Sequence, residues 1–311
     1  VYLAHSCVMS LRRLPVPRNI WKADLMENDI KSLVSTDWLA EHIKDPDLRI
    51  LDASWYLPDA GRDPRAEFDA AHIKGARFFD IDEVADLRSA LPHTVPPVEK
   101  FMSRMRAIGV GDGHQVVVYD GAGLFSAARV WWTFRLMGFE NVAVLDGGLP
   151  KWQAEGRPVD AKPATIRDRH MIVKRQDHLI KDVTQVARAA KLEDHTIIDA
   201  RPAPRFEGTA PEPREGMRAG HIPNSQNVPF STLLNDDKTM KPKAELQAIF
   251  DAAGADLSKP IITTCGSGVT ACVLALALYQ IGKTDAAVYD GSWSEWGMYG
   301  DLPIATGPAD A

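Results

Sequence analysis

Short apolar runs alternate along the chain with longer helical stretches that stop at glycine. The runs QVVVY (115–119) and PIITT (260–264) have the length and the β-branched content of strands that are buried on both faces. The stretches SAARVWWTFRLMG and GVTACVLALALYQIG are typical of helices, and we expect them to end at Gly138 and Gly282. This alternation predicts an α/β fold in which helices flank both faces of a parallel sheet.

The pattern occurs twice, which indicates a duplication. Three pairs of segments match in the same order and at a nearly constant offset: RILDASW (49–55) with TIIDARP (196–202), AAHIKGARFFD (70–80) with AGHIPNSQNVP (219–229), and VAVLDGGLPKW (142–152) with AAVYDGSWSEW (286–296). A polar, proline-bearing stretch separates the copies and is typical of a connector. We therefore predict two tandem domains, at 33–155 and 182–305, joined by a linker at 156–181.

The composition is that of a globular protein of about two domains, with 311 residues, 45% of them hydrophobic. The formal net charge of -6 argues against nucleic acid or an anionic membrane as the main partner. No apolar stretch reaches the ~20 residues that a membrane-spanning helix needs. The three cysteines, Cys7, Cys265 and Cys272, do not make a disulfide framework, so we expect a reducing compartment.

The first 25 residues differ from the rest of the chain. The segment LRRLPVPRNIWKAD is basic, as in an organellar presequence, an expression scar, or sequence upstream of a start at Met26. We favour the last two interpretations and expect a cytoplasmic protein. A mitochondrial location is the alternative if this segment is a presequence.

Cys265 lies where the strand 260–264 gives way to a helix. In a parallel sheet this places the thiol at the carboxyl end of a strand, where open α/β sheets bind their ligands. The loop that follows contains two glycines, so its backbone N–H groups can turn toward the sulfur and favour a nucleophilic thiolate. Cys272, further along the helix, is expected to be an inert buried residue. In the first copy Asp120 takes the place of Cys265, so that copy is expected to act as a scaffold and cleft wall.

These motifs resemble one protein family. The repeated D-A…G-H-I-P pattern, the loop CGSGVT and the segment DGSWSEW are similar to the tandem rhodanese-type sulfurtransferases, and CGSGVTAC resembles their 3-mercaptopyruvate branch. The thiosulfate branch of the family usually has basic residues in this loop, as in C-R-K-G-V-T. Gly266 and Ser267 replace that basic pair, which suits a mono-anionic keto acid better than thiosulfate. Thiosulfate sulfurtransferase is the alternative function.

The resemblance implies a mechanism without cofactor or metal. Cys265 would take the sulfur of 3-mercaptopyruvate as a persulfide, release pyruvate, and pass the sulfur to a thiol, thioredoxin or cyanide. The family's two substrate-binding arginines match Arg205 and Arg214 in RFEGTAPEPREG. The family's catalytic serine, aspartate and histidine match Ser267, Asp82 and His93, of which the last two lie in the first copy. The expected site therefore spans the domain interface of a monomer, with the loop residues Gly266, Gly268, Val269 and Thr270 around the substrate.

Simpler interpretations exist for several of these residues. Alone, the two arginines would be solvated surface charges, His93 a surface loop residue, and Asp82 a helix N-cap. His72 and His221 lie at equivalent positions of the two copies. Because the copy without a nucleophile keeps its histidine, we expect both to anchor turns rather than to catalyse. A cysteine phosphatase needs C-x5-R, and Ala271 stands where that arginine would be. The tryptophan pairs at 131–132 and at 293 and 296 are expected to pack in the core.

Overall fold

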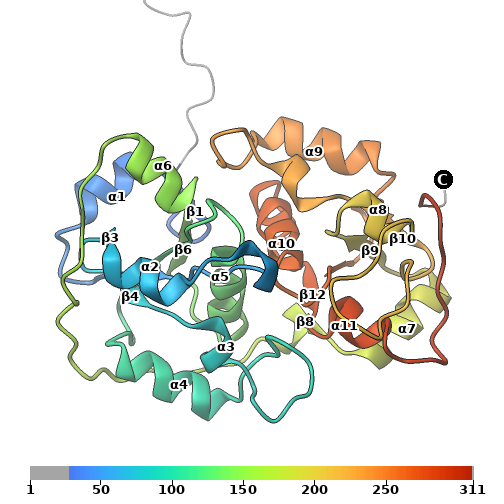
Figure 1. Cartoon of the computed structure of the whole chain (residues 1–311), viewed down its shortest axis with the longest axis horizontal. Coiled ribbons are helices and arrows are strands. Elements are labelled where there is room, and N and C mark those ends of the chain that lie inside the picture. Colours follow the sequence, from blue (N-terminus) through green and yellow to red (C-terminus); the bar gives the residue numbers. More distant parts are fainter. Residues whose placement is uncertain (1–27, 310–311) are drawn as a thin grey trace, which may run out of the picture.

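The computed structural model describes residues 28–309, and in this range the chain forms two halves that lie side by side (Figure 1). The predictions for residues 1–25 and for Cys7 lie outside the described residues. Among residues 28–309, no helix has both the length and the apolar character that crossing a membrane requires.

Each half contains a five-stranded parallel sheet, and the two sheets have the same topology. In both, the strand that precedes the long buried helix lies at the centre, because it pairs with a strand on each side. The first sheet has the order β1 (Leu33–Val34), β6 (Val142–Leu145), β5 (Gln115–Tyr119), β2 (Leu48–Asp52) and β4 (Arg77–Phe78). The second has the order β8 (Ile180–Lys181), β12 (Ala287–Tyr289), β11 (Ile261–Thr264), β9 (Thr196–Asp199) and β10 (Ser225–Asn227).

Alternate residues of the central strand in the first half point to opposite faces, as the pleat of a strand requires. Val116 and Val118 belong to one hydrophobic cluster, while Val117 and Tyr119 belong to another. Helices therefore cover both faces of the sheet, as predicted. The helices of the first half are α1 (Thr36–His42), α2 (Pro64–Ala70), α3 (Ile81–Val84), α4 (Val98–Ala107), α5 (Ala127–Leu136) and α6 (Gly148–Ala154), with the short 3₁₀ helix η1 (Pro58–Ala60).

The second half repeats this arrangement. Ile197, Ile262 and Tyr289 face one cluster, and Ile198, Ile261 and Val288 face the other. The helices of the second half are α7 (Val183–Leu192), α8 (Ala203–Phe206), α9 (Lys243–Ala252), α10 (Ala271–Gln280) and α11 (Ser292–Trp296), with η2 (Asp177–Leu179) and η3 (Phe230–Leu233). The duplication and the α/β class predicted from the sequence are confirmed.

The two halves share one hydrophobic core. The long helices α5 and α10 pack against each other where the halves meet, and residues of both helices belong to the same buried cluster (Figure 1). Trp131 and Trp132 of α5 are fully buried there, as are Trp293 and Trp296 on the far side of the second sheet, which confirms their predicted packing role. The helices end as expected, with Gly138 and Gly282 in the left-handed region at φ 81° and 87°.

The connector between the copies contributes two short strands. β7 (Val159–Asp160) pairs with β3 (His72–Ile73) in an antiparallel ladder, and β8 is the edge strand of the second sheet. The predicted linker at 156–181 is thus ordered against both halves, because its backbone finds ladder partners at both ends. His72 and His221 anchor turns as expected, since their Nδ1 atoms lie 2.7 and 2.9 Å from the carbonyl oxygens of Phe68 and Phe206.

Candidate active site

Cys265 directly follows β11 and lies at the carboxyl edge of the second sheet. Only 2% of the residue is exposed. The first turn of α11 binds the cysteine loop through two backbone hydrogen bonds. The amide of Trp293 donates to the Cys265 carbonyl at 2.9 Å, and that of Ser294 donates to the Gly266 carbonyl at 2.8 Å. The amide of Cys265 in turn donates to Oγ of Ser292 at 3.2 Å. Three backbone groups of the loop are thereby fixed, so the thiol has a defined position.

The amide cradle that the sequence predicts around the sulfur is not formed. Among the described residues, no backbone amide donates a hydrogen bond to Sγ of Cys265. The equivalent loop of the first half does form such a cradle, because the buried carboxylate of Asp120 accepts hydrogen bonds from four amides. They come from Ala122, Gly123, Phe125 and Ala127, at 2.8 to 2.9 Å. The carboxylate oxygens lie one bond further from the backbone than a cysteine sulfur does.

Gly268 gives the cysteine loop its shape. Its φ of +77° is the left-handed conformation that favours glycine, and a Cβ there would lie 2.8 Å from the carbonyl oxygen of Asp290. Its carbonyl accepts hydrogen bonds from Cys272 Sγ at 3.2 Å and from Arg129 Nη1 at 3.3 Å. Cys272 is fully buried, and burial raises the pKa of its thiol to about 12, so it is inert as predicted. Of the other loop residues, Ser267 is buried and Val269 packs into the core.

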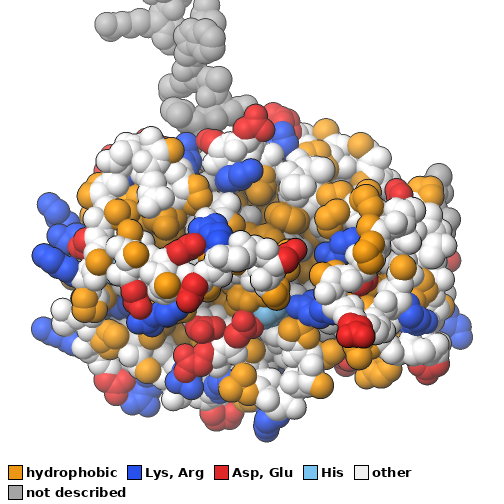
Figure 2. All heavy atoms as spheres, viewed as in Figure 1, with side chains coloured by type: hydrophobic (Ala, Val, Ile, Leu, Met, Phe, Trp, Pro, Cys, Tyr) orange, Lys and Arg blue, Asp and Glu red, His pale blue; other side chains and the backbone are white. Residues whose placement is uncertain are grey.

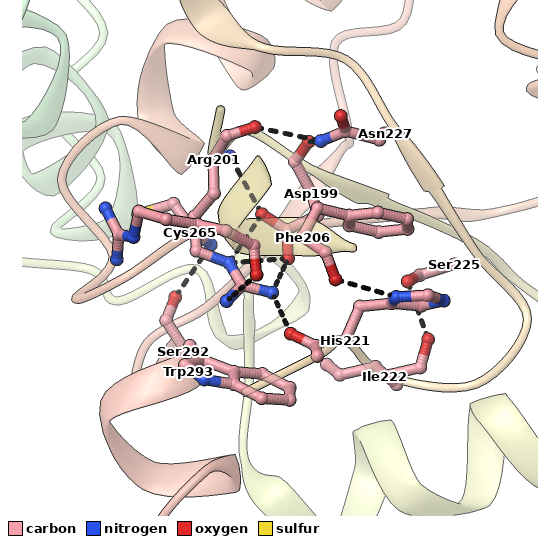
Figure 3. Close-up of polar contacts among 12 residues, drawn as sticks. Asp199, Arg201, Phe206, His221, Ile222, Ser225, Asn227, Cys265, Ser292 and Trp293 are labelled. Atoms are coloured by element: carbon pink, nitrogen blue, oxygen red, sulfur yellow. Dashed lines mark hydrogen bonds and ion pairs between the residues drawn. The ribbon is translucent and has the colours of Figure 1, made fainter. Parts of the chain in front are cut away.

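A buried network of charges lies beside the thiol (Figure 3). Arg201 forms ion pairs with Asp199 and Glu212, and all three side chains are only 1% exposed. Glu212 also forms an ion pair with Arg205 at 2.5 Å, and the Arg205 side chain is 21% exposed. A Cβ built on Gly266 would lie 3.1 Å from Nη2 of Arg205. Glu212 therefore holds the Arg205 guanidinium against the cysteine loop, and Arg205 is no solvated surface charge.

Arg214 is half-buried on the same side of the loop. Its Nη1 donates to Oγ of Ser294 at 3.2 Å. Burial lowers the pKa of Arg214; the negative charges of Cys265 and Asp82 oppose this shift, while the positive charge of Arg205 adds to it. These mutual influences show that residues predicted from three separate segments come together around the thiol.

His93 and Asp82 form a pair that enters the site from the first half. Nδ1 of His93 lies 2.6 Å from Oδ1 of Asp82, and Nε1 of Trp55 donates to Oδ2 of Asp82 at 2.9 Å. Burial alone would raise the pKa of Asp82, but the hydrogen bonds and charge of His93, with Trp55 and Arg214, hold it below its usual range. Asp82 is not the N-cap of α3: Asp80 has that role and accepts from the amides of residues 82 and 83.

His93 has an uncommon backbone conformation for a residue with a side chain. Its φ is +58°, and the residue is only 7% exposed, with its ring edge-on to Trp55 at 4.6 Å. Nε2 of His93 has no hydrogen-bond partner among the described residues, and its Nδ1 approaches Asp82 closely without the angles of a well-formed hydrogen bond. A cavity of about 20 Å³ lies behind His93, which is room for about one water molecule. On the face shown in Figure 2, hydrophobic side chains and a histidine lie between charged side chains in the middle of the molecule.

Sequence reasoning missed several residues of this site. Glu212, Arg201 and Ser292 fix the loop or the arginines but carry no motif of their own. The sequence did offer a signal for Arg201 and Ser292. Arg201 lies in the TIIDARP segment and Ser292 in the DGSW segment, and both segments identified the repeat. Arg129 and Asp290, which join the halves at the site, could not be paired without the structure.

Comparison with known proteins agrees with this geometry. The model of the rhodanese-like domain family matches residues 35–155 and again residues 182–299. The chain is 45% identical to thiosulfate/3-mercaptopyruvate sulfurtransferase 1, mitochondrial, of Arabidopsis thaliana, over 88% of this chain and 77% of that protein. It is 44% identical to the thiosulfate sulfurtransferase of Cricetulus griseus, over 86% of this chain and 92% of that protein.

A solved structure shares the whole arrangement. The 3-mercaptopyruvate sulfotransferase SseA of Escherichia coli superimposes with a TM-score of 0.77 at 40% identity, over 85% of this chain and 99% of that one. Two matches to one domain family, each on one half of the duplicated fold, agree with the repeat that the sequence shows. The chain therefore belongs to the rhodanese-like domain family and carries this domain twice, with the loop thiol in the second copy.

Proposed function

We propose that the protein is a sulfurtransferase that moves the sulfur of 3-mercaptopyruvate to a thiol, thioredoxin or cyanide through a persulfide on Cys265. The observation that carries this proposal is the position of the thiol at the carboxyl end of β11, between two arginines of one half and the His93–Asp82 pair of the other. Because both halves of the site belong to one chain, a monomer suffices.

The first step is a displacement at sulfur. The Cys265 thiolate attacks the sulfur of 3-mercaptopyruvate, an S–S bond forms, and the C–S bond breaks with its electron pair passing to carbon as the enolate of pyruvate. The proton of the mercapto group ends on that carbon, so thiolate and mercaptopyruvate give persulfide anion and pyruvate. In the second step an acceptor thiolate takes the outer sulfur, and the electron pair of the S–S bond returns to Cys265.

The first half suggests what the cysteine loop is built to hold. The oxygens of Asp120 lie two bonds beyond Cβ, and four loop amides bind them. The outer sulfur of a Cys265 persulfide also lies two bonds beyond Cβ. If the amides of the cysteine loop converge as those around Asp120 do, they suit the charged outer sulfur better than Sγ, which receives no amide hydrogen bond from residues 28–309.

The charges of the site suit a donor with one carboxylate. Arg205 is already paired with Glu212, so Arg214 supplies the cation that is least neutralised. One guanidinium of this kind matches the carboxylate of a keto acid, while the dianion thiosulfate would need more positive charge. Sterics also favour the keto acid. The Arg205 guanidinium lies where a side chain at position 266 would begin, so the basic side chain typical of the thiosulfate branch would displace it. Thiosulfate remains the second candidate donor, since the Arabidopsis relative is named for both.

Proton transfer falls to the residues around the enolate. Ser267 is buried two residues after the nucleophile, and His93 faces the site with a carboxylate fixed on its Nδ1 side. In this arrangement His93 and Ser267 carry the proton from the mercapto group toward carbon, while Asp82 fixes the orientation of the imidazole. Arg205 and Arg214 hold the carboxylate and the ketone oxygen of the donor.

Mass analysis after exposure to 3-mercaptopyruvate tests the proposal. We expect one added sulfur on the peptide that contains Cys265, with release of an equal amount of pyruvate. Cys265→Ser should abolish both signals, and Cys272→Ser is the matched control that should keep the added sulfur. Turnover by the Cys265→Ser variant, or sulfur located on Cys272, would refute the assignment.

The choice between donors needs a second assay. Turnover with mercaptopyruvate and with thiosulfate is compared in the same preparation, and the keto acid should be preferred. Because Ser267 is placed beside the ketone, Ser267→Ala should reduce mercaptopyruvate turnover more than thiosulfate turnover. Equal losses on both donors would contradict this placement.

A further inference from the structure

Arg129 connects the two halves directly beneath the site. It is the third residue of α5 in the first half, and its side chain is 4% exposed. Its guanidinium donates to Oδ1 of Asp290 at 2.6 Å, to the carbonyl oxygen of His93 at 2.6 Å and to that of Gly268 at 3.3 Å. One side chain therefore binds the histidine loop, the cysteine loop and the strand end that follows β12.

Asp290 completes the connection from the second half. Its Oδ2 accepts the amide of Val95 at 2.9 Å, so the segment 93–95 is held at both ends, by Arg129 and by Asp290. The guanidinium also lies over the ring of Trp132, with 4.7 Å between its carbon and the ring centroid. Both charges are almost excluded from water, so neither can lose its partner without a large penalty.

The duplication provides an internal comparison for this arrangement. On the other side of the pseudo-symmetric interface, Asp146 follows β6 and accepts the amide of Met240 at 2.8 Å, as Asp290 accepts that of Val95. Lys238 there has φ +68°, as His93 has +58°. The third residue of α10, which corresponds to Arg129, is Val273. A crossing segment is thus docked without any guanidinium.

From this asymmetry we infer that Arg129 is a positioning residue for sulfur transfer, which fixes the His93 segment relative to the cysteine loop. Docking of a crossing segment needs no guanidinium, since on the other side the carboxylate of Asp146 and the ion pair between Lys151 and Asp237 are enough. The additional contacts of Arg129, to the carbonyls of His93 and Gly268, occur only on the side that carries the thiol. This inference rests on the proposed function and extends it to a residue that touches no reacting atom.

The test begins with Arg129→Met, which keeps an unbranched side chain out to the position of Nε and removes the three hydrogen bonds of the guanidinium. We expect kcat for transfer from mercaptopyruvate to fall by about 10- to 100-fold, because a shift of up to ~1 Å between reacting groups has an effect of this size. KM should change far less, since Arg205 and Arg214 are held by Glu212 and Ser294.

Arg135→Met is the matched control. Arg135 also lies on α5 and donates to the carbonyl of Thr284 in the second half at 2.8 Å, but it lies nearly two helical turns beyond Arg129. This variant should keep the wild-type kcat. If both variants lose the same activity, the role of Arg129 is ordinary interface packing and the inference is wrong.

The double variant Arg129→Met with Asp290→Asn separates positioning from folding. It removes the unpaired buried carboxylate that the single variant leaves behind, so the melting temperature should recover toward that of the wild type while kcat stays low. Recovery of kcat together with the melting temperature would overturn the inference. Failure of both Arg129→Met and the double variant to fold would also overturn it, since Arg129 would then be needed for folding itself. A wild type without persulfide formation would refute the proposed function, whereas an active wild type with an equally active Arg129→Met would refute only this inference.

Discussion

The carboxylate of Asp120 offers the sharpest test of how the first half is built. It lies in the loop that corresponds to the cysteine loop, it is fully buried, and it accepts four amide hydrogen bonds. We consider its replacement by alanine and by asparagine. Alanine removes all four acceptor contacts, while asparagine keeps one oxygen and turns an NH₂ group toward the two remaining amides.

The magnitude follows from the hydrogen bonds. A buried donor left without its acceptor costs about 1–3 kcal/mol, and four such donors set an upper limit of about 12 kcal/mol. Water can enter the vacated space and satisfy part of them, so we expect Asp120→Ala to lose about 3–6 kcal/mol. Asp120→Asn should lose about half of that. Since native proteins are stable by only about 5–15 kcal/mol and the two halves share one core, the alanine variant should lose a large part of the free energy of unfolding.

Urea unfolding, fitted as one transition because the two halves share a core, measures these losses. Asp63→Ala is the control, because Asp63 also accepts two amides but does so at the exposed N-terminus of α2, where a lost cap costs about 1 kcal/mol. The rate of sulfur transfer per folded molecule should stay at the wild-type value. A loss for Asp120→Ala no larger than that of the control would refute the argument that this loop is held together around an internal anion.

Three further predictions follow from the site and the interface. Arg214→Ala should raise KM for mercaptopyruvate about 10- to 100-fold, because a charged hydrogen bond to the donor is lost; unchanged KM in steady-state assays would dismiss its binding role. Gly266→Ala should displace the Arg205 guanidinium by a few tenths of an ångström and raise KM more than it lowers kcat. Wild-type KM in the Gly266→Ala variant would contradict the steric argument. Burial raises the pKa of Asp146 to about 7, above its unfolded value of about 4, so stability should fall as the pH rises from about 4 to 7. Melting curves of Asp146→Asn should lack this part of the fall, and an identical pH profile would disprove it.

The sequence predicted the parts of the molecule that depend on local pattern. Strand ends, helix ends and the duplication follow from short runs of residues, and the position of Cys265 follows from them in turn. The roles of charged residues were harder, because their partners come from distant segments. Asp82 illustrates this: as the first acidic residue inside α3 it has the local appearance of a cap, yet Asp80 caps the helix and leaves Asp82 free to pair with His93. Glu212 pairs with Arg201 and Arg205 through a loop whose path no periodicity encodes.

The two halves have equivalent backbones but different charges, and this difference explains why a copy without a nucleophile is retained. Each half sends a segment across to the strand ends of the other, where a carboxylate receives its amide: Asp290 for Val95 and Asp146 for Met240. In one direction the crossing segment carries His93, which Arg129 links to the cysteine loop, and in the other it covers a loop that Asp120 already fills. Loss of the first half would therefore remove the histidine, its aspartate and the guanidinium beneath the cysteine loop together. For this reason we expect the second half alone to be inactive in sulfur transfer even where it can be made to fold.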